Sequence, residues 1–225
     1  MKEETMKRRR LVIPICLLLV LSAVRVSGQS EAELKATRWT DSYGLFTELM
    51  VSVAPAARGN EYFPPMASNK LAWILEESYQ GRLILDFHGE NLDLNQPNIL
   101  MQAGYEGGKP YVRISAPALW HWVREVSNVP KGFNQEIKHD FLIGVVHQAV
   151  HLEHPTDVLY KLASSPESWA IEETRAWREV VMGVVAPLRS QNQSVGTVFV
   201  QAHELLKKCA EPHDCPAFEK YVSVR

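Results

Sequence analysis

The sequence of 225 residues lacks several features that would assign it to a common enzyme class. It has no glycine-rich loop of the type that binds phosphates and no nucleophile-elbow motif. It also has no internal repeat, no low-complexity tract and only three cysteines. What remains is a composition with 46% hydrophobic and 22% charged residues, which is typical of a globular protein and too apolar for a disordered chain.

A long hydrophobic run is absent as well, because the most apolar segment covers only residues 11–24. A membrane-spanning helix needs roughly 20 such residues. The segment follows the basic residues 7–10 and precedes the small residues 26–28, an order typical of a secretory signal peptide. We therefore expect a signal peptide over residues 1–28 and a secreted or periplasmic protein without stable membrane insertion. Retention of the segment as an N-terminal anchor is the alternative.

Basic residues are scarce once the expected signal peptide is set aside. Residues 1–28 hold six of the 24 Lys and Arg and two of the 26 Asp and Glu. The rest of the chain therefore has 18 basic and 24 acidic residues, a net charge of −6 compared with −2 for the whole sequence. It has no Lys/Arg cluster and so lacks the electrostatic footprint of a nucleic-acid-binding protein. We expect no nucleic-acid partner.

Two of the three cysteines, Cys209 and Cys215, lie six positions apart near the C-terminus. In an exported chain such a pair predicts one local disulfide that closes a turn. A metal site that includes His213, between the two cysteines, is the alternative. The third cysteine, Cys16, belongs to the expected signal peptide.

The pattern of apolar residues predicts an α+β fold, in which helices precede and follow a small antiparallel sheet. This order divides the exported chain into an N-terminal helical segment, residues 29–80, and an α+β domain, residues 81–225. The sheet is expected to contain a hairpin that turns at Gly107 and Gly108. The predicted strands cover residues 82–87, 98–102 and 111–115, and the predicted helices cover residues 30–53, 69–79, 117–126, 134–153, 166–186 and 195–208.

Prolines set the expected helix boundaries in the second half of the chain. Pro155 and Pro187 cannot continue a helix, so we expect helices to end just before them. Pro166 suits the first position of a helix, and Ser164 and Glu167 have the spacing of a capping box there.

The residues most informative about function lie in the long predicted helix, where His147 and His151 are four positions apart. Side chains at this spacing lie one above the other on a helix face, so both imidazoles can reach one divalent ion. The helix is otherwise apolar here, and an unpaired imidazole is costly to bury. The alternative is that both histidines face solvent or make ordinary hydrogen bonds.

The segment His-Gln-Ala-Val-His resembles the metal-binding helix of the zincin metallopeptidases, whose motif is His-Glu-x-x-His. In the gluzincin branch of that class, the third ligand is a glutamate from a following helix, some twenty residues downstream. Glu172 and Glu173 lie 21 and 22 residues after His151. Of the two, the resemblance favours Glu173, because a small residue, here Ala176, commonly follows that glutamate by three positions. The resemblance therefore implies a Zn²⁺ site formed by His147, His151 and Glu173.

Position 148 departs from the family motif, because Gln148 stands where the zincins have glutamate. The resemblance implies that this glutamate takes a proton from the attacking water and passes it to the leaving amine. Glutamine cannot accept a proton, and general-base catalysis is typically worth roughly 10²–10⁴-fold. We expect either that another carboxylate, Glu172 or Glu153, is the base, or that a metal site persists without efficient hydrolysis.

Two functions follow as hypotheses. The first is an exported zinc-dependent peptidase, or an inactive relative of one, with a peptide or protein as substrate or ligand. The second is a non-catalytic secreted binding or scaffold protein of mainly helical structure. In the family fold, residues 111–115 would form the edge strand that precedes the metal helix. Trp169 and Trp177 are expected to be core or groove aromatics, and Arg175 and Arg178 to form surface ion pairs.

Overall fold

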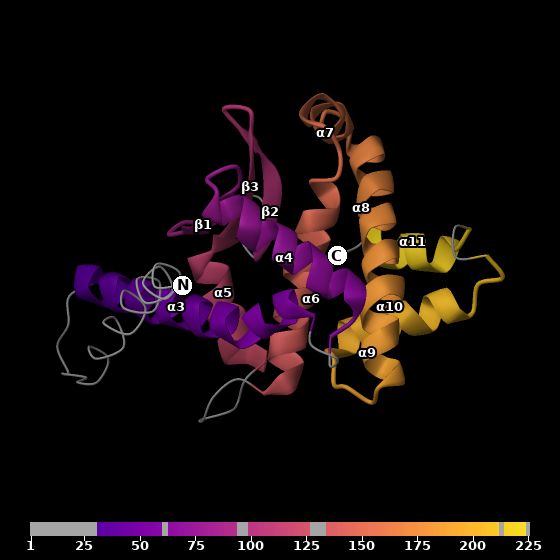
Figure 1. Ribbon diagram of the computed structural model, residues 1–225, viewed down its shortest axis with the longest axis horizontal. Coiled ribbons are helices and arrows are strands. Elements are labelled where there is room, and N and C mark those ends of the chain that lie inside the picture. Colours follow the sequence, from indigo (N-terminus) through magenta and orange to yellow (C-terminus); the bar gives the residue numbers. More distant parts are fainter. Residues whose placement is uncertain (1–30, 60–62, 94–98, 127–133, 212–213, 224–225) are drawn as a thin grey trace, which may run out of the picture.

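The computed structural model of the protein describes residues 31–59, 63–93, 99–126, 134–211 and 214–223. The signal peptide expected over residues 1–28 and the alternative ligand His213 lie outside these ranges. Within them, none of the helices combines the length and the apolar character that a membrane span requires. The described chain has the predicted α+β fold, which combines helices with one three-stranded sheet at the edge of the molecule (Figure 1).

The sheet contains the expected hairpin, formed by β2, Met101–Glu106, and β3, Lys109–Ser115. Its turn consists of Gly107 and Gly108, whose φ angles of 57° and 78° lie in the left-handed region that favours glycine. The remaining strand, β1, covers Ile84–His88 and pairs with β3 in parallel. The sheet is therefore mixed, which corrects the prediction of a purely antiparallel sheet.

The strand order β1-β3-β2 also corrects the prediction that residues 111–115 form an edge strand. These residues belong to β3, which is the central strand and has neighbours on both sides. Side-chain alternation along a strand indicates which face is buried, but it does not indicate the direction of the neighbouring strand. The sequence pattern therefore predicted the strands without predicting how they are ordered.

The N-terminal helical segment packs on the rest of the fold. It contains α3, Glu31–Val53, a 3₁₀ turn over Ala54–Arg58, and α4, Pro65–Tyr79. Helix α4 begins four residues before the expected start at residue 69. Pro65 occupies its first position, where the missing N–H leaves no hydrogen bond unmade. Both α3 and α4 contact the long helix α6, Gln135–His151.

The second half of the chain is almost entirely helical. Two short helices, α7 (Thr156–Ala163) and α11 (Pro216–Ser223), were not predicted, and the first of them follows directly after Pro155. Ser165, rather than Ser164, caps α8 (Pro166–Val180), and its hydroxyl accepts a hydrogen bond from the N–H of Ser168. Besides α6, the helices are α5 (Ala116–Val126), α7 (Thr156–Ala163), α8 (Pro166–Val180), α9 (Ala186–Ser190), α10 (Thr197–Lys207) and α11 (Pro216–Ser223).

The helix that begins at Pro166 does not end before Pro187, as the sequence predicted. It continues through a π turn, Val181–Val185, into α9. In a regular α-helix the proline ring would clash with the carbonyl group four residues earlier. The wider π turn, in which Ala186 N–H bonds to Val181 C=O, accommodates the proline at the start of α9.

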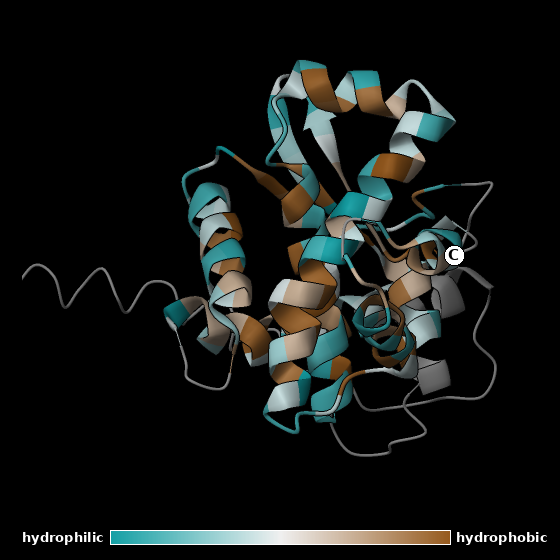
Figure 2. Ribbon diagram, turned by 90° about the vertical axis from the view of Figure 1, so that its right-hand side faces the viewer, coloured by the Kyte–Doolittle hydropathy of each residue, from teal (hydrophilic) through white to brown (hydrophobic). Residues whose placement is uncertain are grey.

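Helix α6 lies at the centre of the molecule, where it contacts α3, α4, α8 and the strands β2 and β3 (Figure 1). Its buried apolar side chains, which include Phe141, Leu142 and Val146, belong to the main hydrophobic core. Figure 2 shows apolar and hydrophilic residues alternating around the surrounding helices, as expected for amphipathic helices. Three histidines are also buried on α6, namely His139, His147 and His151.

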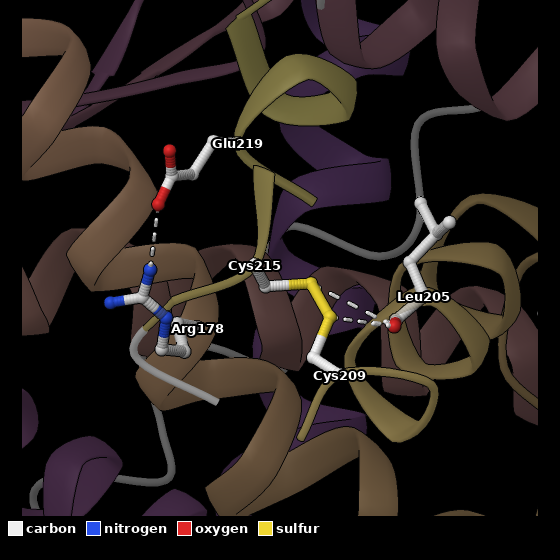
Figure 3. The surroundings of a disulfide bond; sticks show 5 residues. All are labelled: Arg178, Leu205, Cys209, Cys215 and Glu219. Carbon is white, nitrogen blue, oxygen red and sulfur yellow. Dashed lines mark hydrogen bonds and ion pairs between the residues drawn. A yellow bond between two sulfur atoms is a disulfide. The ribbon is translucent and has the colours of Figure 1, made fainter. Parts of the chain in front are cut away.

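The predicted disulfide between Cys209 and Cys215 is confirmed, with the two Cα atoms 5.6 Å apart (Figure 3). The two sulfur atoms lie 3.3 and 3.8 Å from the carbonyl oxygen of Leu205, near the end of α10. The bridge connects α10 to α11, and α11 packs against α8. An ion pair of 3.6 Å between Arg178 and Glu219 supports the same contact.

Candidate metal site

The candidate site lies between α6 and α8, which pack against each other. His147 and His151 lie one turn apart near the C-terminal end of α6, as their spacing requires. Glu172 and Glu173 come from the middle of α8. The structure thus brings together the four residues that the sequence singled out, from two helices joined by α7.

Three side chains converge on a common point. The Nε2 atoms of His147 and His151 lie 3.1 Å apart. Oε2 of Glu173 lies 3.1 Å from the Nε2 atom of His147, and Oε1 of Glu173 lies 3.3 Å from the Nε2 atom of His151. Of the residues that the structure describes, these three form the group of His, Cys, Asp and Glu side chains whose geometry could hold a metal ion.

The three separations match the dimensions of a tetrahedral metal site. Zinc binds nitrogen and carboxylate oxygen at about 2.0–2.2 Å, so neighbouring ligand atoms around a tetrahedral ion lie about 3.3 Å apart. The two Nε2 atoms, and each Nε2 atom and its nearest Glu173 oxygen, lie within a few tenths of an ångström of that value, although Oε2 faces His147 and Oε1 faces His151. With one oxygen from Glu173, the three ligand atoms lie within 4.8 Å of one another, so one ion could bind all three side chains.

The two imidazoles are enclosed by protein. The side chains of His147 and His151 are only 3% and 1% exposed, whereas Glu173 is 27% exposed. Each ring also stacks on a tryptophan of α8, with ring centroids 4.1 Å apart for His147 and Trp177 and 5.0 Å apart for His151 and Trp169. Solvent therefore approaches the group mainly on the side of Glu173.

The electrostatics of the two histidines differ. Burial lowers the pKa of His147, and the nearby carboxylate of Glu173 only partly opposes this effect, so the ring is kept neutral. Burial also acts to lower the pKa of His151, but hydrogen bonds with Glu172 and Glu173 outweigh it and raise that pKa above its ordinary value. The two carboxylates therefore stabilise the protonated form of His151.

Both glutamates are held in the ionised form. Burial acts to raise the pKa of Glu173, but hydrogen bonds from His147 and His151 outweigh it and lower the pKa to about 2. Burial acts in the same way on Glu172, and hydrogen bonds from Arg175, His151 and His154 bring its pKa well below the ordinary value. An ionised carboxylate at Glu173 is the form that binds a metal ion.

Glu172 does not face the point where the three ligand atoms meet. Its Oε1 atom accepts a hydrogen bond of 2.9 Å from Nδ1 of His151, the ring nitrogen opposite to the one facing His147. Its Oε2 atom lies 3.0 Å from Nε2 of His154, and Arg175 donates to both oxygens at 2.8 Å. Glu172 is thereby engaged by three basic side chains, which leaves no oxygen placed to act as a base at the ligand group.

The other expected base, Glu153, is engaged by two basic side chains. It forms an ion pair with Lys70 of α4 and a longer one, 3.7 Å, with Arg175. The Lys70–Glu153 pair lies at a pocket of about 690 Å³ between α4 and α6. The pocket is also lined by Met66, Asn69, Trp73, Ala149 and Leu152. Gln148, which stands in place of the motif glutamate, follows His147 on α6 and is half-buried.

Three residues of the site carry roles that the sequence alone did not predict. Trp169 and Trp177, expected to be ordinary core or groove aromatics, stack on the histidines. Arg175, expected in a surface ion pair, anchors Glu172. All three lie on α8 at helical spacing from Glu172 or Glu173, which is the signal that could have pointed to them.

No protein-family model, no curated protein and no solved structure matches the chain.

Proposed function

We propose that the protein is an exported, zincin-like metal-binding protein that holds one Zn²⁺ ion through His147, His151 and Glu173. The observation that carries the proposal is the convergence of the three side chains: the two Nε2 atoms lie 3.1 Å apart, Oε2 of Glu173 lies 3.1 Å from Nε2 of His147, and Oε1 lies 3.3 Å from Nε2 of His151. Supporting it are the ligand set of two imidazoles and one carboxylate, which suits zinc, and the spacing of the two histidines on one helix. Export rests on the signal peptide expected over residues 1–28 and agrees with the disulfide.

We further propose that the site hydrolyses peptides weakly or not at all. A bound zinc ion supplies Lewis-acid chemistry, but removal of a proton from water needs a base nearby. Gln148 cannot be that base, Glu172 is engaged by His151, His154 and Arg175, and Glu153 pairs with Lys70. The enclosure of both imidazoles also favours a metal site with a structural or binding role over an open catalytic one.

The test is zinc binding by the purified chain without its signal peptide. We expect about one zinc per chain in isothermal titration, and loss of this binding in His147→Ala. His203→Ala is the matched control, because it removes a histidine of α10 that pairs with Arg189 outside the site. Substoichiometric zinc in the wild type, unchanged by His147→Ala, would refute the proposal.

A second arm tests the absence of hydrolysis. The substitution Gln148→Glu restores the base of the zincin motif, so we expect it to raise peptidase activity by roughly 10²-fold or more. A casein digest and a panel of quenched fluorescent peptides provide the measurement. Equal activity in the wild type and Gln148→Glu, inhibited by a chelator in both, would show that another group serves as the base.

One observation favours the second candidate, a non-catalytic scaffold protein. The carboxylates of Glu172 and Glu173 pair directly with imidazoles and Arg175, so the same residues could simply tie α6 to α8. Under this alternative, zinc would neither bind with stoichiometry nor change the stability of the fold.

A further inference from the structure

Two consecutive residues of α8 contact opposite sides of one imidazole ring. Glu173 approaches Nε2 of His151 at 3.3 Å, while Glu172 lies 2.9 Å from Nδ1 of the same ring. An ionised carboxylate can only accept a hydrogen bond, so Nδ1 must carry the proton that joins it to Glu172. When a metal ion replaces the proton that Nε2 shares with Glu173, the ring is neutral and the Nε2 lone pair points to the ion, on the side of His147 and Glu173.

Glu172 is itself rigidly held. Its side chain is 3% exposed, and Arg175 binds it through Nε and Nη2 in a two-point contact. The same Nη2 atom donates to the carbonyl oxygen of Val150 at 3.2 Å, which ties the arrangement to the backbone of α6. His154 adds a further hydrogen bond to the carboxylate. Its oxygens are therefore fixed relative to both helices, and His151 is fixed through them.

His147 has no comparable support. Among the residues that the structure describes, nothing pairs with its buried Nδ1 atom. Stacking against Trp177 restrains the plane of the ring but does not select the nitrogen that carries the proton. The two imidazoles of the site therefore differ, because only His151 has an outer partner that fixes its tautomer.

We propose that Glu172 is the positioning residue of the metal site. It fixes the tautomer and the orientation of His151, so that the Nε2 lone pair faces the ion. It also raises the basicity of the imidazole, which strengthens the bond from Nε2 to the metal. This inference rests on the proposed zinc site at His147, His151 and Glu173. Outer partners of this kind typically contribute 10- to 100-fold in metal affinity. Because His147 lacks such a partner, the site depends on Glu172 for its tight binding of metal.

The first measurement is the zinc dissociation constant of Glu172→Gln, obtained by competition with a chelator. Glutamine keeps the size of the side chain but offers only one acceptor oxygen to His151, His154 and Arg175. We expect zinc binding to weaken 10- to 100-fold with unchanged stoichiometry. The matched control is Glu179→Gln, because Glu179 also bonds to Arg175, at 3.0 Å, and lies on the same helix. Its dissociation constant should equal that of the wild type.

The second measurement needs no variant. Long-range ¹⁵N–¹H correlation spectra of the zinc-bound wild type report which nitrogen of His151 carries the proton. We expect a protonated Nδ1 and a zinc-bound Nε2. Zinc bound at Nδ1, or equal affinities of the wild type and Glu172→Gln, would overturn this inference while leaving the zinc site in place. A wild-type chain that binds no zinc would overturn the proposed function and this inference together.

Discussion

Each half of α6 carries buried histidine, but the two halves differ in what the imidazoles face. In the first half, His139 donates from Nδ1 to the carbonyl oxygen of Ser194 at 2.6 Å. The neighbouring Asp140 accepts from the N–H of Gly196 at 2.8 Å. In the second half, His147 and His151 face each other and two glutamate side chains.

The difference indicates a structural role for His139 and Asp140, whereas we propose metal binding for His147 and His151. Backbone groups at residues 194 and 196 satisfy His139 and Asp140 individually, so this pair fastens the segment before α10 to α6. The second pair instead shares Glu173 as a partner, and the three side chains form a group whose geometry could hold a metal ion. Burial alone does not distinguish the three histidines of α6, whereas the direction of their ring nitrogens does.

The largest expected effect comes from replacing one histidine of each half. We expect His151→Ala to abolish stoichiometric zinc binding, because it removes a ligand. His139→Ala should leave the zinc dissociation constant unchanged and lower the free energy of unfolding by about 1–3 kcal/mol, since it leaves the carbonyl of Ser194 unpaired. Titration calorimetry and urea unfolding of both variants provide the measurements. Similar zinc affinities in the two variants would remove the distinction between the halves.

Zinc should also stabilise the fold through the second half alone. A ligand that binds only the folded state at about 100 times its dissociation constant contributes about 2.7 kcal/mol. For a chain of this size that corresponds to an increase in Tm of about 5–10 °C. We expect this increase in the wild type, reversal by a chelator, and no increase in His147→Ala. A zinc-dependent increase that persists in His147→Ala would locate the stabilising ion elsewhere.

The last expected effect is a pH dependence that arises in the first half. Burial raises the pKa of Asp140 to about 7, and the hydrogen bond from Gly196 only partly opposes it. A raised pKa means that the folded state holds the proton more tightly than the unfolded state, whose Asp titrates near 3.8. The free energy of unfolding should therefore fall as pH rises from about 4 to about 7 and then level off.

This contribution is at most about 1.4 kcal/mol per pH unit. We expect Asp140→Asn to remove it, because asparagine keeps an oxygen for the N–H of Gly196 but does not titrate. Urea midpoints at pH 5 and pH 8 measure the difference, and Glu167→Gln, on the exposed surface of α8, controls for the loss of one negative charge. An unchanged pH dependence in Asp140→Asn would show that other groups dominate.

Local rules predicted much of the fold. The helix start at Pro166, the turn at Gly107 and Gly108, and the bridge between Cys209 and Cys215 each depend on a few neighbouring residues, and all three are confirmed. Features that depend on distant parts of the chain were wrong or missing. The parallel pairing of β1 and the π turn before Pro187 depend on tertiary packing, which no local pattern records.

The same division holds for the candidate site. The spacing of His147 and His151 was visible in the sequence and follows from helical geometry. Glu173 could be singled out because it lies 22 residues after His151, as the resemblance to the gluzincins implies. The role of Glu172 was not, since only the packing of α8 on α6 shows that it reaches the outer nitrogen of His151. The contact of Arg175 with the carbonyl oxygen of Val150 was missed for the same reason, because Val150 lies on the other helix.

The stacking of Trp177 and Trp169 on the two imidazoles has a consequence for observing the site. These are two of six tryptophans in the chain, and their rings lie within 4.1 and 5.0 Å of the histidines. Indole emission responds to the charge and the electronic state of a ring stacked on it. We therefore expect zinc binding at the proposed site to change the emission of these two tryptophans, so that binding can be followed without a dye or a label.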